Sequence, residues 1–198
     1  MKKVLFIAAL FLVCFSMSIN AQTKKEERAA KREALKKERE ARRAIEAQMD
    51  SVAYLKAVSA LEEGEFVLEA NNVTFPNGLV RFVSSNTNYV QVDNGEGVVQ
   101  TAFSNFTYRP GPNGLGGVTV EGKISSPTLK KDKDGNVYYT FSIQGVAISA
   151  TVSISLTAGT NNASAQISPK FNGNNMTMTG SLVPISESDV VQGLLGNG

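Results

Sequence analysis

The sequence predicts a mainly β protein, in which an antiparallel meander forms a barrel or a two-layer sandwich and follows a long charged N-terminal helix. After Gly64 the chain is rich in Val, Thr, Ser, Phe, Tyr, Asn and Gly, which favour strands and turns. Short segments there alternate apolar and polar residues and are separated by Asn-Gly or Asp-Gly pairs, as in hairpins. Before Gly64, residues 23–63 lack Gly and Pro and consist mostly of strong helix formers.

Residues 1–21 have the pattern of a secretory signal peptide, with two lysines, an apolar run from Val4 to Val13, and Ala21 at the expected cleavage position. The run is shorter than the roughly 20 apolar residues that span a bilayer, so cleavage after Ala21 leaves no transmembrane span. Cleavage also removes Cys14, the single cysteine of the chain. We therefore expect an exported protein of the periplasm or cell surface that folds without disulfides.

Residues 22–63 are expected to form a charged to amphipathic helix, whose first half is either a solvated helix or a frayed, charged spacer. Residues 23–49 carry ten basic and six acidic side chains, whereas the chain from residue 50 onward carries eight and twelve. Glu residues four positions ahead of Lys or Arg support this helix in the pairs Glu27–Lys31, Glu33–Lys37 and Glu38–Arg42. The interleaved Glu residues, the leader and the lack of stacking aromatic side chains argue against a nucleic-acid partner.

Apolar side chains begin to repeat in the second half of this helix. The predicted strip consists of Ile45, Met49, Val52 and Lys56, with Tyr54, Leu55, Val58 and Leu61 beside it. This amphipathic spacing predicts that the second half of the helix packs on the β body. A coiled coil is the alternative, although the heptad seam is not sustained over the three or four repeats that would support it.

Residues 64–184 are expected to form the barrel or sandwich, and residues 185–198 a C-terminal tail. The candidate strands are 65–75, 79–83, 89–92, 98–103, 118–124, 137–143, 146–156, 163–167 and 176–182. Clean alternation in two of them predicts which side chains point inward. The inward set is Val118, Val120 and Ile124 in one strand, and Met176, Met178 and Leu182 in the other. Around Gly145 the phase of alternation shifts, which indicates a bulge or a tight bend.

Pairs of Asn or Asp with Gly mark the expected turns, because these residues tolerate positive φ. The pairs are Asn77-Gly78, Asn94-Gly95, Asp134-Gly135 and Asn172-Gly173. Asp132–Asn136 resembles the opening of a calcium loop, but its Gly comes too early and no Glu closes the loop, so a hairpin is favoured. The glycine-rich stretch 111–117 lacks a Lys-Ser/Thr pair and is interpreted as a loop, not as a phosphate cradle.

The composition excludes several classes of enzyme. The chain has no His, which rules out a Ser-His-Asp triad and histidine-containing metal sites, and loss of Cys14 removes any thiol nucleophile. A carboxylate pair is the main remaining acid-base option, and Glu69 and Glu121 are its best candidates. Both also fit the outward, polar phase of their strands, which is the preferred interpretation. We therefore predict no catalytic residue, no cofactor and no metal site.

Five segments give the chain a resemblance to a known family. They follow a signal peptide and a charged helix in the order Phe66–Ala70, Asn88–Asp93, Val98–Gln100, Gly116–Val118 and Gly180–Pro184. Through these segments the chain resembles the secreted Bacteroidetes domain-of-unknown-function family DUF4251, over roughly Leu61 to Pro184. The resemblance implies a periplasmic or surface β-rich domain, and it implies no activity, because none is established for the family.

We expect an envelope protein that is a non-catalytic binding module for an apolar or glycan ligand. An apolar ligand would lie among inward-facing barrel residues, although most barrels of this size are filled by their own side chains. The predicted ligand-lining residues are Tyr139, Phe141, Met176 and Met178. One alternative is a structural or assembly protein that reaches a partner or an envelope component through the charged helix. Another is a carboxylate-dependent glycan hydrolase.

Ser51 is a predicted modification site. The triplet Asp50-Ser51-Val52 has the form of the O-glycosylation triplet of Bacteroidetes envelope proteins, which this short segment resembles. The same serine could instead cap the packed half of the helix through its hydroxyl group. Both interpretations place Ser51 where the charged half of the helix gives way to the apolar half.

Overall fold

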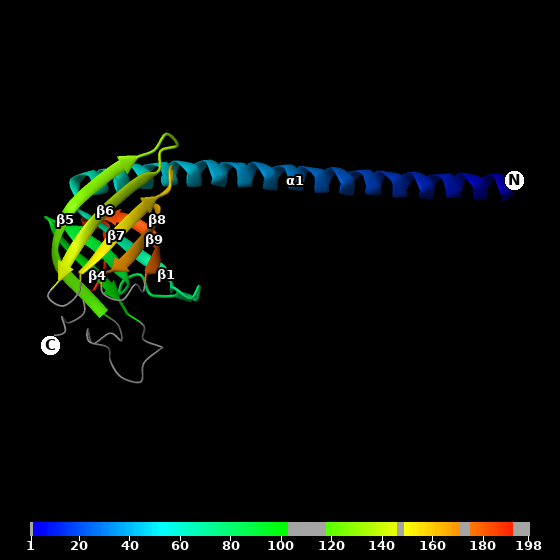
Figure 1. Cartoon of the computed structure of the whole chain (residues 1–198). Helices are drawn as coiled ribbons and strands as arrows, with labels where there is room; N and C mark the ends of the chain where they lie inside the picture. The colour runs from blue at the N-terminus through cyan, green and yellow to red at the C-terminus, as the bar shows by residue number, and fades with distance from the viewer. Residues whose placement is uncertain (1, 103–117, 146–148, 171–174, 192–198) are drawn as a thin grey trace. The chain divides into compact units, whose positions relative to one another are not determined.

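The structure is a computed structural model that describes residues 2–102, 118–145, 149–170 and 175–191, with side chains described from Glu27 onward. The chain forms two compact units, Met1–Gln48 and Met49–Gly198. One long helix, α1 (Lys2–Glu63), supplies the first unit and continues into the second (Figure 1). The predicted loop 111–117, the predicted turn Asn172-Gly173 and strand residues 146–148 lie outside the described residues.

The first unit is a solvated helix, as its charge pattern predicts. Every described side chain from Glu27 to Gln48 is exposed. Lys37 pairs with Glu33 at 3.0 Å and Arg42 with Glu38 at 2.9 Å, which confirms two of the three predicted pairs. The Glu27–Lys31 pair stays a prediction. Among the described residues, no helix is both long enough and apolar enough to cross a membrane.

The second unit contains all the strands of the described chain, and each candidate strand of the sequence is present in it. The strands are β1 (Phe66–Thr74), β2 (Val80–Phe82), β3 (Tyr89–Asp93), β4 (Glu96–Thr101), β5 (Val118–Lys131), β6 (Val137–Gly145), β7 (Ser149–Leu156), β8 (Asn162–Pro169) and β9 (Met176–Pro184). A short 3-10 helix, η1 (Ile185–Glu187), follows β9. β5 runs past its predicted end through a register shift between Ser125 and Thr128, where Ser126 has a φ of 53°.

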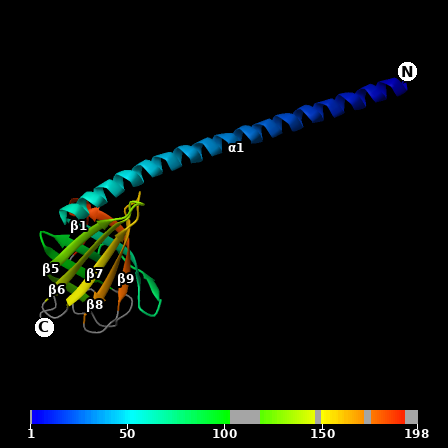
Figure 2. The same ribbon diagram turned by 45° about the horizontal axis from the view of Figure 1, so that its top comes forward.

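The strands form a closed antiparallel barrel, which decides between the two predicted architectures. Each strand from β3 to β9 pairs with its sequence neighbour, and β1 pairs with both β3 and β9, so that eight strands close the ring (Figure 2). β2 pairs with the end of β1 beyond β3. The turn between β3 and β4 has Asn94 at φ 48° and Gly95 at φ 82°, as its Asn-Gly pair predicts. Gln144 of β6 pairs with Ser149 of β7, and the residues of the predicted phase shift between these strands, 146–148, lie outside the described residues.

Two glycines allow neighbouring strands to approach closely where the barrel wall bends. A Cβ atom on Gly180 would lie 1.8 Å from the Glu69 carbonyl oxygen, and one on Gly122 would lie 2.0 Å from the Gln144 carbonyl oxygen. β1 also shifts its register against β9 between Ala70 and Asn72, beside Gly180. A bulge next to a glycine bends a strand, and such bends allow a sheet to close on itself.

The inward faces of the strands form one apolar core. It contains Met178 and Leu182, as predicted, with Val120, Ile124 and Met176 partly buried against it. Val118, which was also expected inside, is 40% exposed because it is the first residue of β5. Burial of each large aliphatic or aromatic side chain in this core contributes about 1.5–3 kcal/mol, which makes the barrel interior the main source of stability.

The second half of α1 packs against this core, as predicted, but through residues expected beside the strip and not through the strip itself. Ala57, Ala60 and Leu61 are buried in the core, and Tyr54 and Val58 pack against it. The predicted strip is wrong, since Met49 is 67% and Val52 54% exposed, and Ile45 is exposed in the first unit. Leu55, which was expected beside the strip, is 65% exposed. Residues 54, 57, 58 and 61 have the spacing of one helix face, and the alanines let the helix backbone lie close to the barrel.

A second, smaller apolar cluster lies on the outside of the barrel. Val67, Tyr89 and Val98 point outward from adjacent strands and are buried. Val183, Ile185 and Val190 pack against them. Residues 185–191, which the sequence assigns to a tail, therefore form a C-terminal segment that covers this part of the wall. The Val191 amide donates to the Asn86 carbonyl at 2.8 Å.

Candidate functional site

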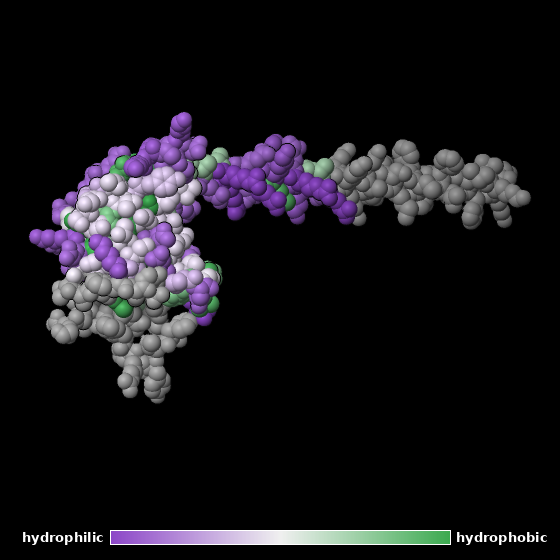
Figure 3. Space-filling model, viewed as in Figure 1, coloured by the Kyte–Doolittle hydropathy of each residue, from purple (hydrophilic) through white to green (hydrophobic). Residues whose placement is uncertain are grey.

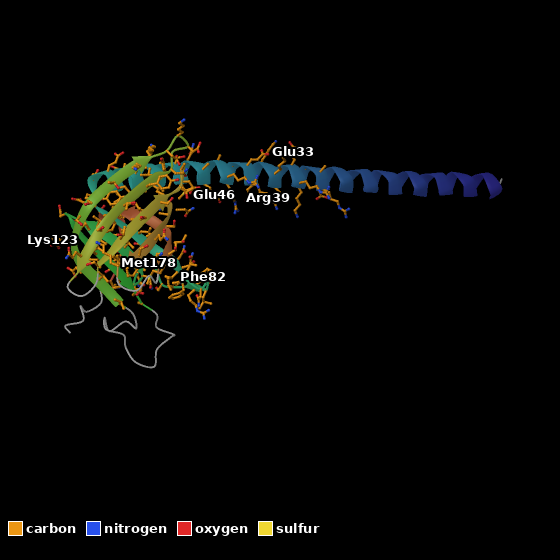
Figure 4. The ribbon with its side chains drawn as sticks, in the orientation of Figure 1. Glu33, Arg39, Glu46, Phe82, Lys123 and Met178 are labelled. Carbon is orange, nitrogen blue, oxygen red and sulfur yellow. The ribbon has the colours of Figure 1, made fainter. Side chains whose placement is uncertain are left out.

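The predicted ligand-lining residues come together inside the barrel. Phe141 and Met178 are fully buried there, Tyr139 is nearly so, and Met176 is partly buried at the edge of the same cluster (Figure 4 labels Met178). The Tyr139 ring meets the Phe66 ring edge-on at 5.3 Å between centroids, and the Phe141 ring at 5.8 Å. Such aromatic contacts fix the rings, so these side chains serve as packing for one another.

A polar row crosses the outer wall beneath the C-terminal segment. Strand register places Ser181, Glu69, Tyr89, Gln100 and Thr119 side by side on consecutive strands. The Gln100 amide donates to the carbonyl groups of Thr87 at 3.1 Å and Val191 at 2.8 Å, and its oxygen accepts from the Thr119 hydroxyl at 3.1 Å. The Ser188 hydroxyl donates to Glu69 at 2.5 Å. The row therefore holds the C-terminal segment in place, which is a structural role.

Tyr89 is the most strongly perturbed titratable group of this outer wall. Burial raises the pKa of Tyr89 to about 12, and the negative charge of Glu121 adds to the effect. The phenol therefore keeps its proton at every physiological pH. A tyrosine with this pKa is far from the pKa near 7 that suits a general acid or base.

Glu69 and Glu121 do not form the carboxylate pair of a glycoside hydrolase. Both point outward, but β3 and β4 lie between their strands, β1 and β5. Three strand spacings of about 4.8 Å place their backbones roughly 14 Å apart, and side chains diverge on a convex wall. Hydrolysis needs carboxyl groups about 5–9.5 Å apart on either side of a substrate. Glu69 is also engaged by the C-terminal segment through Ser188.

The Asp132–Asn136 segment is a hairpin between β5 and β6, as predicted. The Asp132 carboxylate accepts hydrogen bonds from the Asp134 and Asn136 amides and from the Asn136 side chain, at 2.8–3.0 Å. The Asn136 side chain is the main cause that lowers the pKa of Asp132 below its ordinary value, and the two backbone amides add to it. In the described part of the chain, no three acidic, His or Cys side chains gather as a metal site would require.

The exposed face of α1 is the third candidate site. In the second unit it presents Met49, Val52 and Leu55, with Lys56 among them. Lys56 pairs with Glu187 of the C-terminal segment. Ser51 is exposed within the helix, and because α1 runs unbroken through it, the capping role is wrong. Its predicted modification stays a prediction. Figure 3 shows that the coloured part of the first unit is mainly hydrophilic, with scattered apolar residues.

The fold defines the class of protein as a closed eight-stranded antiparallel barrel with a helix packed against its core. Residues 48–182 match the family model described as domain of unknown function (DUF4251), so the chain belongs to this family. The chain is also similar to a DUF4251 family protein from Bacteroides eggerthii DSM 20697, known from a crystal structure. That similarity has 52% identity and a TM-score of 0.63, and covers 72% of this chain and 95% of the other. A search of curated proteins finds no match.

Proposed function

We propose that the protein is an exported envelope component that acts by non-covalent association, with the exposed face of α1 as its working surface. The observation that carries the proposal is the exposure of Met49, Val52 and Leu55 within two turns of one helix. Large apolar side chains gain about 1.5–3 kcal/mol each when they leave water, so a partner that covers them gains affinity. The barrel then serves as the folded support for this surface.

Export is the part of the proposal that rests on the leader. The two lysines, the apolar run and Ala21 support secretion to the periplasm or cell surface. The test is the intact mass of the protein recovered from a bacterium that expresses the whole chain. We expect a mass that corresponds to loss of residues 1–21 and a location outside the cytoplasm. Recovery of the uncut chain in the cytoplasm would contradict export.

The association is tested by cell fractionation of a double variant, Val52→Ser with Leu55→Ser. Neither side chain is part of the core, so we expect a native fold and a smaller share of the protein in the envelope fraction. Phe82→Ser is the matched control, because Phe82 lies on β2 and is 89% exposed (Figure 4). Equal fractionation of the parent, the double variant and the control would refute the proposed role of α1.

Binding of an apolar ligand inside the barrel is a second candidate function. The observation that favours it is Met176, which is only partly buried at the edge of the core cluster in the first position of β9. Native mass spectrometry of protein from the envelope fraction tests it, with a co-purifying lipid as the expected result. The same spectrum tests glycosylation, since Ser51→Ala would remove the added mass. A spectrum of bare polypeptide would contradict both ideas.

A further inference from the structure

We propose that one side of the first unit binds an anionic lipid surface through a row of four arginines, Arg28, Arg32, Arg39 and Arg43. This arginine row lies in a part of α1 to which the proposed function gives no role. The inference rests on the export that the proposed function includes, because export brings the chain to the lipids of the envelope. Its basis is the way in which the charges of the first unit are sorted around the helix axis.

The arginine row occupies one narrow strip of the helix. Its members are spaced by four, seven and four positions, and at 3.6 residues per turn they lie within about 60° of one another. All four side chains are exposed. With a rise of 1.5 Å per residue, the row is about 22 Å long. The guanidinium groups therefore form a line of positive charge along one side of the helix.

The acidic side chains of the same segment lie on other sides of the helix. Between residues 27 and 45 the acidic residues are Glu27, Glu33, Glu38 and Glu40. Each of them is turned by at least about 90° from the middle of the arginine row. Figure 4 shows Glu33 and Arg39 on different sides of the helix. Glu46, about one turn beyond Arg43 on the side of the row, marks the end of the row.

The arginines of the row take no part in the ion pairs of the first unit, as far as the described side chains show. These pairs join Lys36 to Glu40, Lys37 to Glu33, and Arg42 to Glu38. Within the row, Arg28 and Arg32 are like charges four positions apart, as are Arg39 and Arg43, and such pairs destabilise a helix in water. An array of anions over the row would turn this repulsion into attraction.

A flat array of phosphate groups fits a single basic strip better than other anions do. A free phosphate ion needs donors that converge on one point, whereas neighbouring arginines of the row are spaced roughly 6–10 Å apart along the axis. A helix in the major groove of a nucleic acid has phosphates on both sides, where Glu33 and Glu38 would meet them. On a lipid surface the acidic sides stay in water, and each guanidinium group can bind a headgroup phosphate through two donors.

Binding of this kind is peripheral and depends on charge. Leu35 is the only large apolar side chain between Glu27 and Ala44, and it is 46% exposed. A single such side chain adds little insertion, so attraction between charges should supply most of the affinity and salt should screen it. Each arginine at an anionic lipid surface contributes roughly fivefold to the binding constant.

Flotation with lipid vesicles tests the inference on protein made from the whole chain. The anionic vesicles are an equal mixture of phosphatidylglycerol and phosphatidylcholine. Vesicles of phosphatidylcholine alone are the neutral reference, which also reports any binding through the leader. At low salt we expect at least about tenfold stronger binding to the anionic vesicles, and a loss of this preference as salt rises. Equal binding to the two kinds of vesicle would overturn the inference.

The double variant Arg32→Gln with Arg39→Gln removes the two central charges of the row. At roughly fivefold for each arginine, we expect about 25-fold weaker binding to the anionic vesicles. The matched control is Lys37→Gln with Lys123→Gln, which removes the same net charge at exposed positions outside the row. This control should bind like the parent protein, and circular dichroism shows whether all three proteins keep the helix and the strands. An equal loss in both double variants would mean that net charge alone decides binding, which contradicts a role of the row.

The same assays separate the arginine row from the exposed face of α1. If Arg32→Gln with Arg39→Gln lowers vesicle binding and the share in the envelope fraction, whereas Val52→Ser with Leu55→Ser changes neither, the row stands and the proposed working surface falls. The reverse result overturns the row and leaves that surface in place. Tighter binding of the parent protein to duplex DNA than to anionic vesicles at the same salt would also overturn the lipid inference.

Discussion

The two faces of α1 between Met49 and Glu63 are built from similar apolar residues and have opposite environments. Leu61 is 1% exposed against the barrel core, whereas Leu55 on the other side is 65% exposed. Both leucines belong to the same stretch of helix, so intrinsic helix propensity does not distinguish them. The difference lies in their neighbours: Ala57 and Ala60 flank the buried side and let the helix backbone come close to the strands. The two alanines thus let Leu61 reach the barrel core, whereas Leu55 stays exposed.

The largest expected effect comes from the same substitution on each face. Leu61→Ala removes a fully buried side chain and should lower the free energy of unfolding by about 2–5 kcal/mol. Leu55→Ala, at an exposed position, should change it by less than about 0.5 kcal/mol. Urea denaturation followed by circular dichroism measures both. Similar losses for the two variants would show that the two faces are not different in the way the structure describes.

A substitution at Tyr54 tests the hydrogen bond that this residue makes from the packed face of α1 to the barrel. Its hydroxyl donates to the Gly135 carbonyl at 2.5 Å, and the Lys131 ammonium group lies 5.7 Å from its ring centre. Tyr54→Phe keeps the ring and should cost about 0.5–1.5 kcal/mol of unfolding free energy. Tyr138→Phe is the control, because Tyr138 is exposed and its bond to Asp132 is longer, at 3.3 Å. An equal cost for both variants would contradict a specific anchor at Tyr54.

Asp132 makes the stability of the hairpin that contains Gly135, the hydrogen-bond partner of Tyr54, depend on pH. Its pKa in the folded protein lies below the ordinary value of 3.8. The stabilisation it provides is therefore present above that value and is lost as the pH falls through the lower, folded pKa. Asn136→Ala removes the main cause and should raise the pKa of Asp132, measured by carboxyl NMR titration. An unchanged titration midpoint in this variant would rule out Asn136 as the cause.

The smallest expected effect is at Lys56, which lies on the exposed face of the helix. Its ion pair with Glu187 is solvent-exposed on both sides. Lys56→Gln should change the free energy of unfolding by no more than about 0.5 kcal/mol, with less difference in high salt. Chemical denaturation at two salt concentrations measures it. A loss above 1 kcal/mol would mean that the C-terminal segment depends on this pair far more than exposed pairs allow.

Most of the fold could be predicted from the alternation of apolar and polar residues and from the residue types at the turns. The strand with Tyr139 and Phe141 and the turn at Asn94-Gly95 follow from local rules, because side-chain period and positive φ are properties of short segments. The pairing of β1 with β9 could not be predicted this way, since it joins residues far apart in the chain. Tyr54, Val58 and Leu61 of the packed helix face were expected, but only beside a strip centred on other residues. Ala57 and Ala60 were not expected there, because alanine adds little to an apolar pattern.

The candidate sites were less predictable than the fold. The barrel core contains Tyr139, Phe141 and Met178, as the alternation of apolar and polar residues implied. Their contact depends on closure of the barrel, which local patterns do not predict. The C-terminal segment was missed because four polar residues, 186–189, separate Ile185 from Val190 and leave no regular apolar pattern. The sequence did contain a signal for a covered outer wall in Phe66-Val67-Leu68. A strand with one solvent-exposed face would not contain three consecutive apolar residues. Such a run indicates that both faces are covered.

Closure of the barrel by β1 and β9 also constrains when the protein can fold. Phe66 pairs with Pro184, so the ring is incomplete until the chain has been made as far as Pro184. Contacts at such sequence separation slow folding, because a long loop must be ordered before the contact stabilises it. Until then the first strand has an open edge, which can pair with strands of other chains. Folding should therefore be slow, and the nascent chain should need protection from aggregation until its last strand arrives.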